Sequence, residues 1–100
     1  MYSVISYWTT SADYTEEMKQ AVQETIVPSL MNLGAQQVYC VQSDAESVQA
    51  VVTIFSSEAA ATAARLAQEE PRTEASTTMP VTFQSEIRGA VFAAGQTEQN

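Results

Sequence analysis

Two residues that could act on a ligand, Ser6 and Trp8, stand two positions apart near the start of the chain. The segment 2–10 has the alternation of a strand, so both side chains would lie on one face of it. A tryptophan ring and a hydroxyl in one cavity could stack against a flat aromatic ligand and orient it. The simpler interpretation is that Trp8 anchors the core and Ser6 is a hydrogen-bonded hydroxyl.

Arg65 and Tyr39 are the other side chains with a candidate role, Arg65 in catalysis and Tyr39 in substrate binding. Arg65, or Arg88 in its place, could hold an anionic substrate group or an oxyanion. In an acidic protein the simpler interpretation of each arginine is an ion-pair partner. Tyr39 and Tyr7 could donate protons in a pocket, although Tyr7 is better suited to a dimer interface.

Composition excludes several kinds of chemistry. The sequence contains no histidine, which rules out histidine-based acid–base catalysis, serine–histidine pairs and zinc sites built from histidine and cysteine. We expect no metal and no cofactor. Cys40 is the single cysteine, and no cation or helix start is evident beside it, so we expect a buried structural thiol. The pairs Glu16/Glu17 and Glu69/Glu70 are expected on solvated surface.

The charge balance limits the partners. Four basic residues against twelve acidic ones give a net charge of −8. Nucleic acid binding needs clustered cations, and these four are scattered, so we expect no nucleic acid partner. The same charge disfavours a membrane surface, and no apolar run is long enough for a span. The N-terminus lacks the pattern of a signal peptide, and a lone cysteine suits a reducing compartment, so we expect a cytoplasmic protein.

Periodicity predicts one domain over residues 1–95, followed by a frayed tail at 96–100. The expected order is strand 2–10, helix 14–33, strand 37–42, strand 48–55, helix 58–70 and a strand that starts at 81 and could reach 94. In that last strand, regular alternation would place Phe83 and Ile87 on one face and Glu86 and Arg88 on the other.

Local signals predict how the helices begin and end. Asp13, three residues before Glu16, has the spacing of a capping box, and Ser56 or Ser57 would cap the second helix. Pro28 should kink or break the first helix near residue 27, because it lacks a backbone donor and clashes with a preceding carbonyl. Gly34 is expected to end that helix.

The element order predicts a ferredoxin-like α+β fold: βαββαβ, with a four-stranded antiparallel sheet and both helices on one face. Bulky residues occur on both faces of the first and third strands, as Tyr7 beside Trp8 and Ile54 beside Phe55 show. A large exposed apolar face usually marks an interface, so we expect a homodimer with two sheets packed face to face. The alternative is a sheet that leaves some aromatic side chains exposed to water.

The chain resembles the dimeric α+β-barrel superfamily, in particular the small antibiotic-biosynthesis-monooxygenase-like proteins. The resemblance rests on ISYW at 5–8, IVPSL at 26–30 before LGA at 33–35, VVTIFSSEAAATAA at 51–64 and IRGAVFAAG at 87–95. It implies homodimers with a pocket between helices and sheet in each subunit. Some members oxidise polycyclic aromatic substrates without metal or flavin, others degrade haem, and many have no known activity. This chain has Glu74, Ala64 and Ser6 where haem-degrading members carry a histidine, an aromatic residue and an asparagine, which weighs against haem chemistry.

Three functions therefore stay open. The first is a cofactor-independent monooxygenase-like enzyme that acts on a hydrophobic or aromatic metabolite, held in a dry pocket and oriented by Trp8. The second is a non-catalytic homodimeric module that binds or senses a small molecule, which the absence of a base with a pKa near 7 favours. The third is an assembly module whose task is to associate with another chain.

Overall fold

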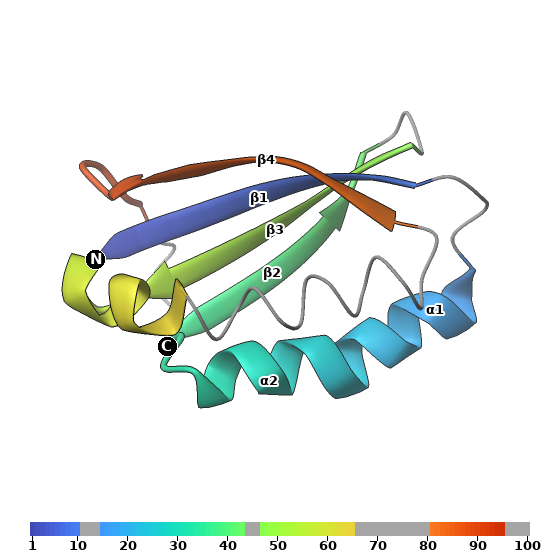
Figure 1. Ribbon diagram of the computed structural model, residues 1–100, viewed down its shortest axis with the longest axis horizontal. Coiled ribbons are helices and arrows are strands. Elements are labelled where there is room, and N and C mark those ends of the chain that lie inside the picture. The colour runs from blue at the N-terminus through green and yellow to red at the C-terminus, as the bar shows by residue number, and fades with distance from the viewer. Residues whose placement is uncertain (11–14, 44–46, 66–80, 96–100) are drawn as a thin grey trace.

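A computed structural model describes residues 1–10, 15–43, 47–65 and 81–95 of the chain. The strands are β1 (Tyr2–Thr10), β2 (Gln37–Gln42), β3 (Val48–Phe55) and β4 (Val81–Ala90). They form one sheet in the order β2-β3-β1-β4, and every neighbouring pair is antiparallel (Figure 1). This order and the two helical segments on one side of the sheet confirm the predicted ferredoxin-like topology.

The first helical segment runs without a gap through α1 (Glu16–Ala21), the π-helical turn η1 (Val22–Ile26) and α2 (Val27–Asn32). Its N-cap is Thr15, whose hydroxyl accepts a hydrogen bond from the backbone N–H of Met18 at 3.2 Å. The predicted cap at Asp13 is therefore wrong, because the helix begins at Glu16 and Thr15 satisfies one of its free N–H donors.

Pro28 does not break this helix. The helix instead widens into the π-helical turn just before the proline, and the backbone N–H of Val27 bonds to the carbonyl of Val22, five residues back. Pro28 lacks a donor and its ring would meet the carbonyl of Glu24, so a wider turn accommodates it. The predicted interruption is present as this turn.

The end of α2 follows the prediction for Gly34. This glycine has a positive φ of 106°, which residues with a side chain rarely adopt. Its N–H bonds to the carbonyl of Met31, and the N–H of Ala35 bonds to that of Leu30, which is the Schellman pattern. The turn brings the chain directly into β2.

The second helix covers residues 58–65 of the described chain. Ser57 caps it, accepting a hydrogen bond from the N–H of Ala60 at 3.1 Å, as predicted. The rest of the predicted helix to residue 70, the loop before Pro80 and the tail at 96–100 lie outside the described residues. Ala61 and Ala64 have no bulk beyond Cβ, which lets the helix approach the sheet closely.

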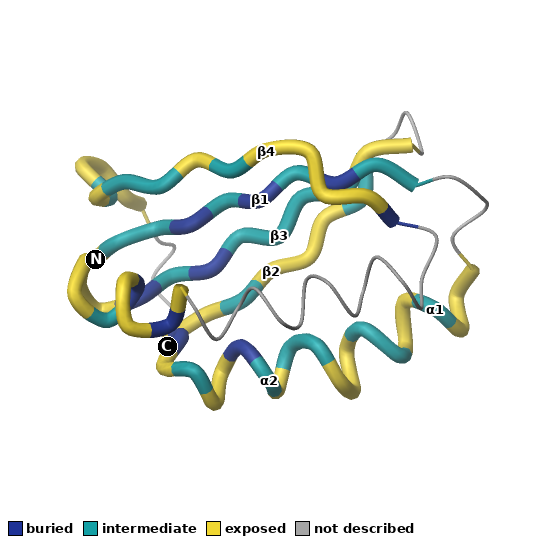
Figure 2. The backbone as a smooth tube through the Cα atoms, viewed as in Figure 1, coloured by how far each residue is buried: buried dark blue, intermediate teal, exposed yellow. Residues whose placement is uncertain are grey.

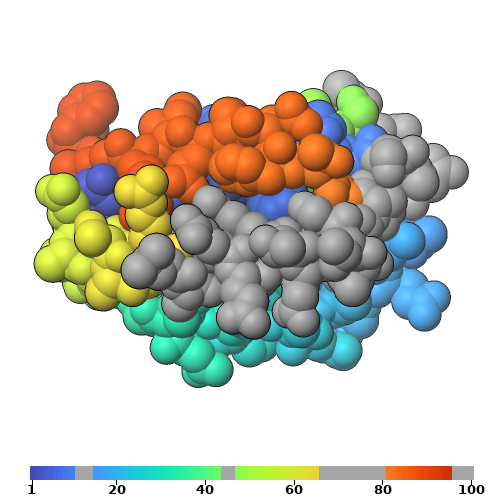
Figure 3. All heavy atoms as spheres, viewed as in Figure 1, coloured from blue at the N-terminus to red at the C-terminus, as the bar shows by residue number. Residues whose placement is uncertain are grey.

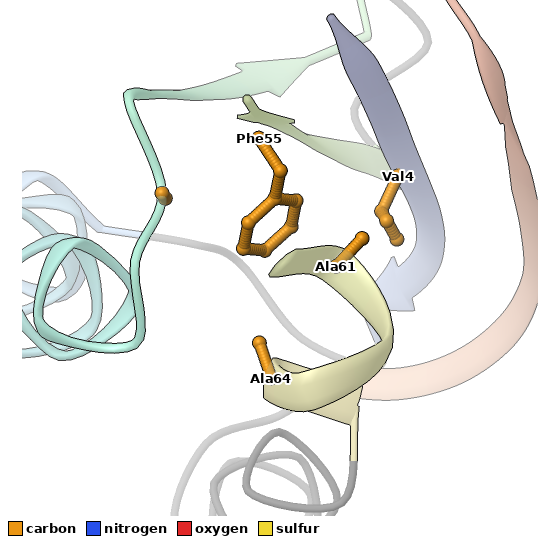
Figure 4. Close-up of a cluster of buried hydrophobic side chains, with 5 residues drawn as sticks. Val4, Phe55, Ala61 and Ala64 are labelled. Carbon is orange, nitrogen blue, oxygen red and sulfur yellow. The ribbon is translucent and has the colours of Figure 1, made fainter. Parts of the chain in front are cut away.

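The core lies where this second helix meets the sheet. Phe55 is fully buried, and its ring packs among Val4, Ala61 and Ala64 (Figure 4). Ala35 completes the buried cluster, and Leu33 and Val38 pack against it. A large ring facing two alanines fills this end of the interior.

The last strand differs from its prediction in two ways. A bulge at Gln84 shifts the register between Tyr7 and Trp8, so Trp8 pairs with Phe83 while Ser6 pairs with Glu86. Phe83 and Glu86 therefore share the helix-side face, and the predicted regular alternation is wrong. The strand ends at Ala90, opposite Tyr2, because β1 offers no further partner there beyond a bond from the N–H of Val91 to the carbonyl of Met1.

Candidate functional site

A cavity of about 670 Å³ lies between the first helical segment and the sheet. The described residues that line it come from both layers: Lys19, Val22, Gln23, Ile26 and Val27 from the helix, and Trp8, Val38, Tyr39, Cys40, Val41, Gln42, Gln49, Ala50, Val51 and Val81 from the strands. In the space-filling view, β4 forms the upper layer and α1–α2 the lower one, and part of β1 is visible between them (Figure 3).

The cavity explains why the first helix buries so little. Val22, Ile26 and Val27 line the cavity, yet each is only half-buried. Leu30 is the single buried residue of this segment, and the rest of the helix is coloured as intermediate or exposed in Figure 2. At the Leu30 end, the core around Phe55 occupies the space between the layers. At the other end the layers stand apart, and the apolar stripe faces a hollow.

Sheet register places the cavity wall in rows across the strands. One row carries Gln42, Gln49, Trp8 and Phe83, and a row further along carries Cys40, Val51, Ser6 and Glu86. Because directly paired residues share a face, both rows look toward the helices.

Trp8 and Ser6 lie together on this face, as their spacing predicts. The indole Nε1 donates a hydrogen bond of 2.9 Å to Ser6 Oγ, and both side chains are buried. The indole also meets the ring of Phe83 edge to face, with centroids 5.4 Å apart and an interplanar angle of 79°. Trp8 lines the cavity, whereas Ser6 is not among its described lining residues.

Tyr39 is among the residues that line the cavity and lies on the edge strand β2. Its row of paired residues is Tyr39, Val52, Ile5 and Ile87, which crosses all four strands on the face away from the helices. The ring is more than half exposed. The structure thus separates Tyr39 from Trp8 and Ser6 by the thickness of the sheet.

Cys40 is exposed, which corrects the prediction of a buried thiol. It lies on an edge strand and lines the cavity, so the hollow that replaces packed side chains leaves it accessible. The surrounding protein still shields it in part, and this burial raises the pKa of the Cys40 thiol above its ordinary value. The thiol is therefore accessible but weakly ionised.

The two arginines have different surroundings. Arg65 is exposed at the last described turn of the second helix and is not among the described lining residues. Arg88 bonds to Glu86 Oε1 and to the carbonyl of Ala61, each at 3.1 Å. Arg88 therefore ties β4 to the second helix, which is the ion-pair role considered for it.

Lys19, Gln23, Gln42 and Gln49 are lining residues that sequence reasoning missed. The helix runs antiparallel to β2, so its start lies near the end of β2 and the start of β3, where these polar side chains gather. The available signal was Lys19 itself, the one lysine of the chain, on a turn that also carries the apolar stripe.

The chemistry available in the described lining is apolar contact, amide hydrogen bonding, one phenol, one ammonium and one thiol. No carboxylate belongs to that described lining, and no group of three potential metal ligands occurs in the described part of the chain. Within the same ranges, no helix is long and apolar enough to cross a membrane. The geometry suits holding an apolar molecule by shape and by a few polar contacts.

Two solved structures have a similar backbone. HapK from Hahella chejuensis matches with a TM-score of 0.73 at 13% identity, covering 99% of this chain and 100% of that one. A dimeric ferredoxin-like protein from an uncultured marine organism matches with a TM-score of 0.67 at 12% identity, covering 97% and 100%. The likeness is one of fold.

Sequence comparison adds no family to this. Neither a protein-family model nor a curated protein matches the chain. The resemblance to antibiotic-biosynthesis-monooxygenase-like proteins therefore stays a prediction, while the ferredoxin-like fold is shown by the sheet order and by the two structural neighbours.

Proposed function

We propose that this protein binds a small hydrophobic molecule with a flat aromatic ring in the cavity between α1–α2 and the sheet. The observation that carries the proposal is a half-open cavity of about 670 Å³, lined by residues of both layers. Ligand sites of proteins usually have volumes of roughly 300–1,000 Å³ and a mostly apolar wall with a few polar groups. Val22, Ile26 and Val51 supply such a wall, and Trp8 adds an aromatic side chain to it.

Binding can be tested with N-phenyl-1-naphthylamine, an uncharged aromatic probe whose fluorescence rises in apolar surroundings. Trp8 is the only tryptophan, so quenching of its emission reports a probe beside it. Val51→Phe would fill the cavity and should weaken binding by about tenfold or more, since a side chain would take the ligand's space. Thr62→Phe makes a change of similar size at an exposed residue of the second helix, outside the described lining and away from the outer face of the sheet, and should leave affinity within about twofold. Equal effects of the two variants would contradict binding in the cavity.

We also propose that the protein works as a homodimer joined through the outer face of the sheet. The row formed by Tyr39, Val52, Ile5 and Ile87 makes that face apolar across all four strands, and Ile87 is 58% exposed. Contiguous apolar surface of this kind is typical of interfaces. One structural neighbour is described as a dimeric ferredoxin-like protein, which supports the proposal.

A matched pair of variants tests the dimer. Ile87→Lys places a charge on the outer face of the sheet, whereas Met31→Lys makes the same charge change at a residue of α2 that is 43% exposed. Sedimentation equilibrium should give twice the chain mass of 10.8 kDa for the parent protein and for Met31→Lys. Ile87→Lys should give the monomer mass. A monomeric parent protein would contradict the proposal.

Oxygenation of the bound ring without a cofactor is the second candidate function. The apolar lining from Val22, Ile26 and Val27 favours it, because these side chains would hold an electron-rich ring and shield one side of it from water. For an anthrone-type substrate, the methylene carbon would lose its two hydrogens, one oxygen atom would become the carbonyl and the other would leave as water. Oxygen uptake above the buffer rate that disappears in Val51→Phe would make the protein an enzyme. Binding without uptake would make it a carrier or sensor, and no binding at all would favour an assembly role.

A further inference from the structure

The one charged group in the described lining of the cavity has a sign opposite to the net charge of the protein. Lys19 is the one charged side chain among the described lining residues, while the chain has a net charge of −8. An acidic protein repels anions over most of its surface, so a cation in the cavity wall changes which ligands the cavity can hold. This feature goes beyond size and apolarity, because it distinguishes ligands that have the same ring system.

Amide side chains surround the same end. Gln42 and Gln49 are directly paired across β2 and β3, and the next residue of their row is Trp8. Lys19 and Gln23 approach from the helix, whose start lies over this end of the sheet. Beyond these groups, Ile26 and Val38 continue the cavity as an apolar wall. The cavity therefore has a polar end and an apolar end.

The present partner of Lys19 is weakly held. Its ammonium contacts Glu16 Oε1 at 3.2 Å, with the two side chains 46% and 90% exposed. Exposed pairs of this kind contribute little to stability and are screened by salt. An anionic group entering the cavity could therefore take the place of the Glu16 carboxylate beside Lys19 at little cost.

We infer that the ligand is amphipathic: an apolar ring system with one anionic group, a carboxylate or an ionised phenol or enol, placed beside Lys19. This inference rests on the proposed function, because it assigns an orientation to a ligand of that cavity. The ring lies against Ile26, Val38 and Val51, and the anionic group lies at the end formed by Lys19 and Gln49.

Two probes that share one skeleton test this inference. N-phenyl-1-naphthylamine is uncharged, and 8-anilino-1-naphthalenesulfonate adds a sulfonate to the same rings. Both are titrated at low ionic strength against the parent protein. The quantity compared is the affinity for the sulfonate divided by the affinity for the uncharged probe. Lys19→Gln should weaken sulfonate binding by about three- to tenfold and change binding of the uncharged probe by less than about twofold. Lys19→Arg should keep the parent ratio.

Two more variants serve as controls. Arg65→Gln makes the same change in net charge at an exposed residue that is not among the described lining residues, and it should leave the ratio unchanged. Glu16→Gln removes the competing carboxylate and should strengthen sulfonate binding by up to about threefold. Raising the salt concentration should reduce the difference between the parent protein and Lys19→Gln.

The outcomes separate this inference from the proposed function. A ratio that falls in Lys19→Gln and not in Arg65→Gln supports the anionic ligand. A ratio that falls equally in both variants, or in neither, overturns it and leaves cavity binding intact if the uncharged probe still binds. Failure of both probes to bind the parent protein overturns the proposed function, and the inference falls with it.

Discussion

The indole nitrogen of Trp8 donates its hydrogen bond to the hydroxyl of Ser6, two residues earlier on β1, at 2.9 Å. The bond satisfies a buried donor and holds the ring on the helix-side face of the sheet, where it lines the cavity. Ser6 thus positions the one aromatic ring of the described lining that faces the helices, without lining the cavity itself.

Removal of the Ser6 hydroxyl should destabilise the fold. Ser6→Ala leaves the Trp8 N–H buried without its acceptor, so we expect the free energy of unfolding in urea to fall by about 1–3 kcal/mol. Ser3→Ala is the matched control, because Ser3 lies on the same strand and on the opposite face. It should cost less than about 0.5 kcal/mol. Equal losses of stability in the two variants would contradict a stabilising role for the hydrogen bond between Trp8 and Ser6.

Arg88 should stabilise the fold, because it links β4 to the second helix. It reaches Glu86 and the carbonyl of Ala61, and both Arg88 and Glu86 are mostly buried. Arg88→Met removes the guanidinium beside the partly buried Glu86 carboxylate and its bond to the Ala61 carbonyl, and we expect the free energy of unfolding in urea to fall by about 1–3 kcal/mol. Adding Glu86→Gln should recover part of that loss. Unchanged stability in Arg88→Met alone would contradict a stabilising link between β4 and the second helix.

The sequence predicts best where the signal is local. Gly34 and Ser57 end and begin helices as expected, because a positive φ and a capping hydroxyl depend on adjacent residues. The strand order follows from hydrophobic alternation and short connections. The bulge at Gln84 was missed because the alternation of apolar residues continues through it, and only pairing with β1 reveals the shift.

The cavity could not be predicted for a related reason. Val22 and Ile26 form the same apolar stripe whether the opposite wall is in contact or stands apart, so periodicity alone does not distinguish a packed core from a hollow one. The spacing of Ser6 and Trp8 predicted that both lie on one face of the strand, and this is confirmed. Tyr39 could not be assigned to a face until the register of β2 against β3 was known.

Replacing Pro28 should change both the π-helical turn before it and the affinity of the cavity for a ligand. Pro28→Ala restores a backbone donor, and the π-helical turn at Val22–Ile26 can then close into an α-helix. We expect the free energy of unfolding to rise by about 1 kcal/mol, because alanine has a higher helix propensity than proline. Val22 and Ile26 would rotate relative to the sheet, so affinity for N-phenyl-1-naphthylamine should fall. A stabilised variant with unchanged affinity for the probe would show that the π-helical turn does not affect binding in the cavity.

Cys40 provides a pH-dependent reporter of the cavity. Burial raises the pKa of its thiol, so the reactive thiolate is rarer in the folded protein than in the unfolded chain at any pH below that pKa. The rate of alkylation by iodoacetamide should therefore reach its half-maximum at a higher pH in native buffer than in urea. The same shift means that any stability from the protonated thiol is present below the unfolded pKa and is lost as pH rises through the folded pKa. A native profile at or below the urea profile would contradict this environment.

The most direct test of cavity binding is an NMR measurement of which methyl groups touch the bound ring. Isotope-labelled protein is saturated with N-phenyl-1-naphthylamine, and nuclear Overhauser contacts between probe and protein are assigned. Binding between the layers predicts contacts to the methyl groups of Val22, Ile26 and Val51 and to the indole of Trp8. Contacts confined to Ile87 and Val48, which are exposed and outside the described lining, would place the ring elsewhere and contradict the proposed site.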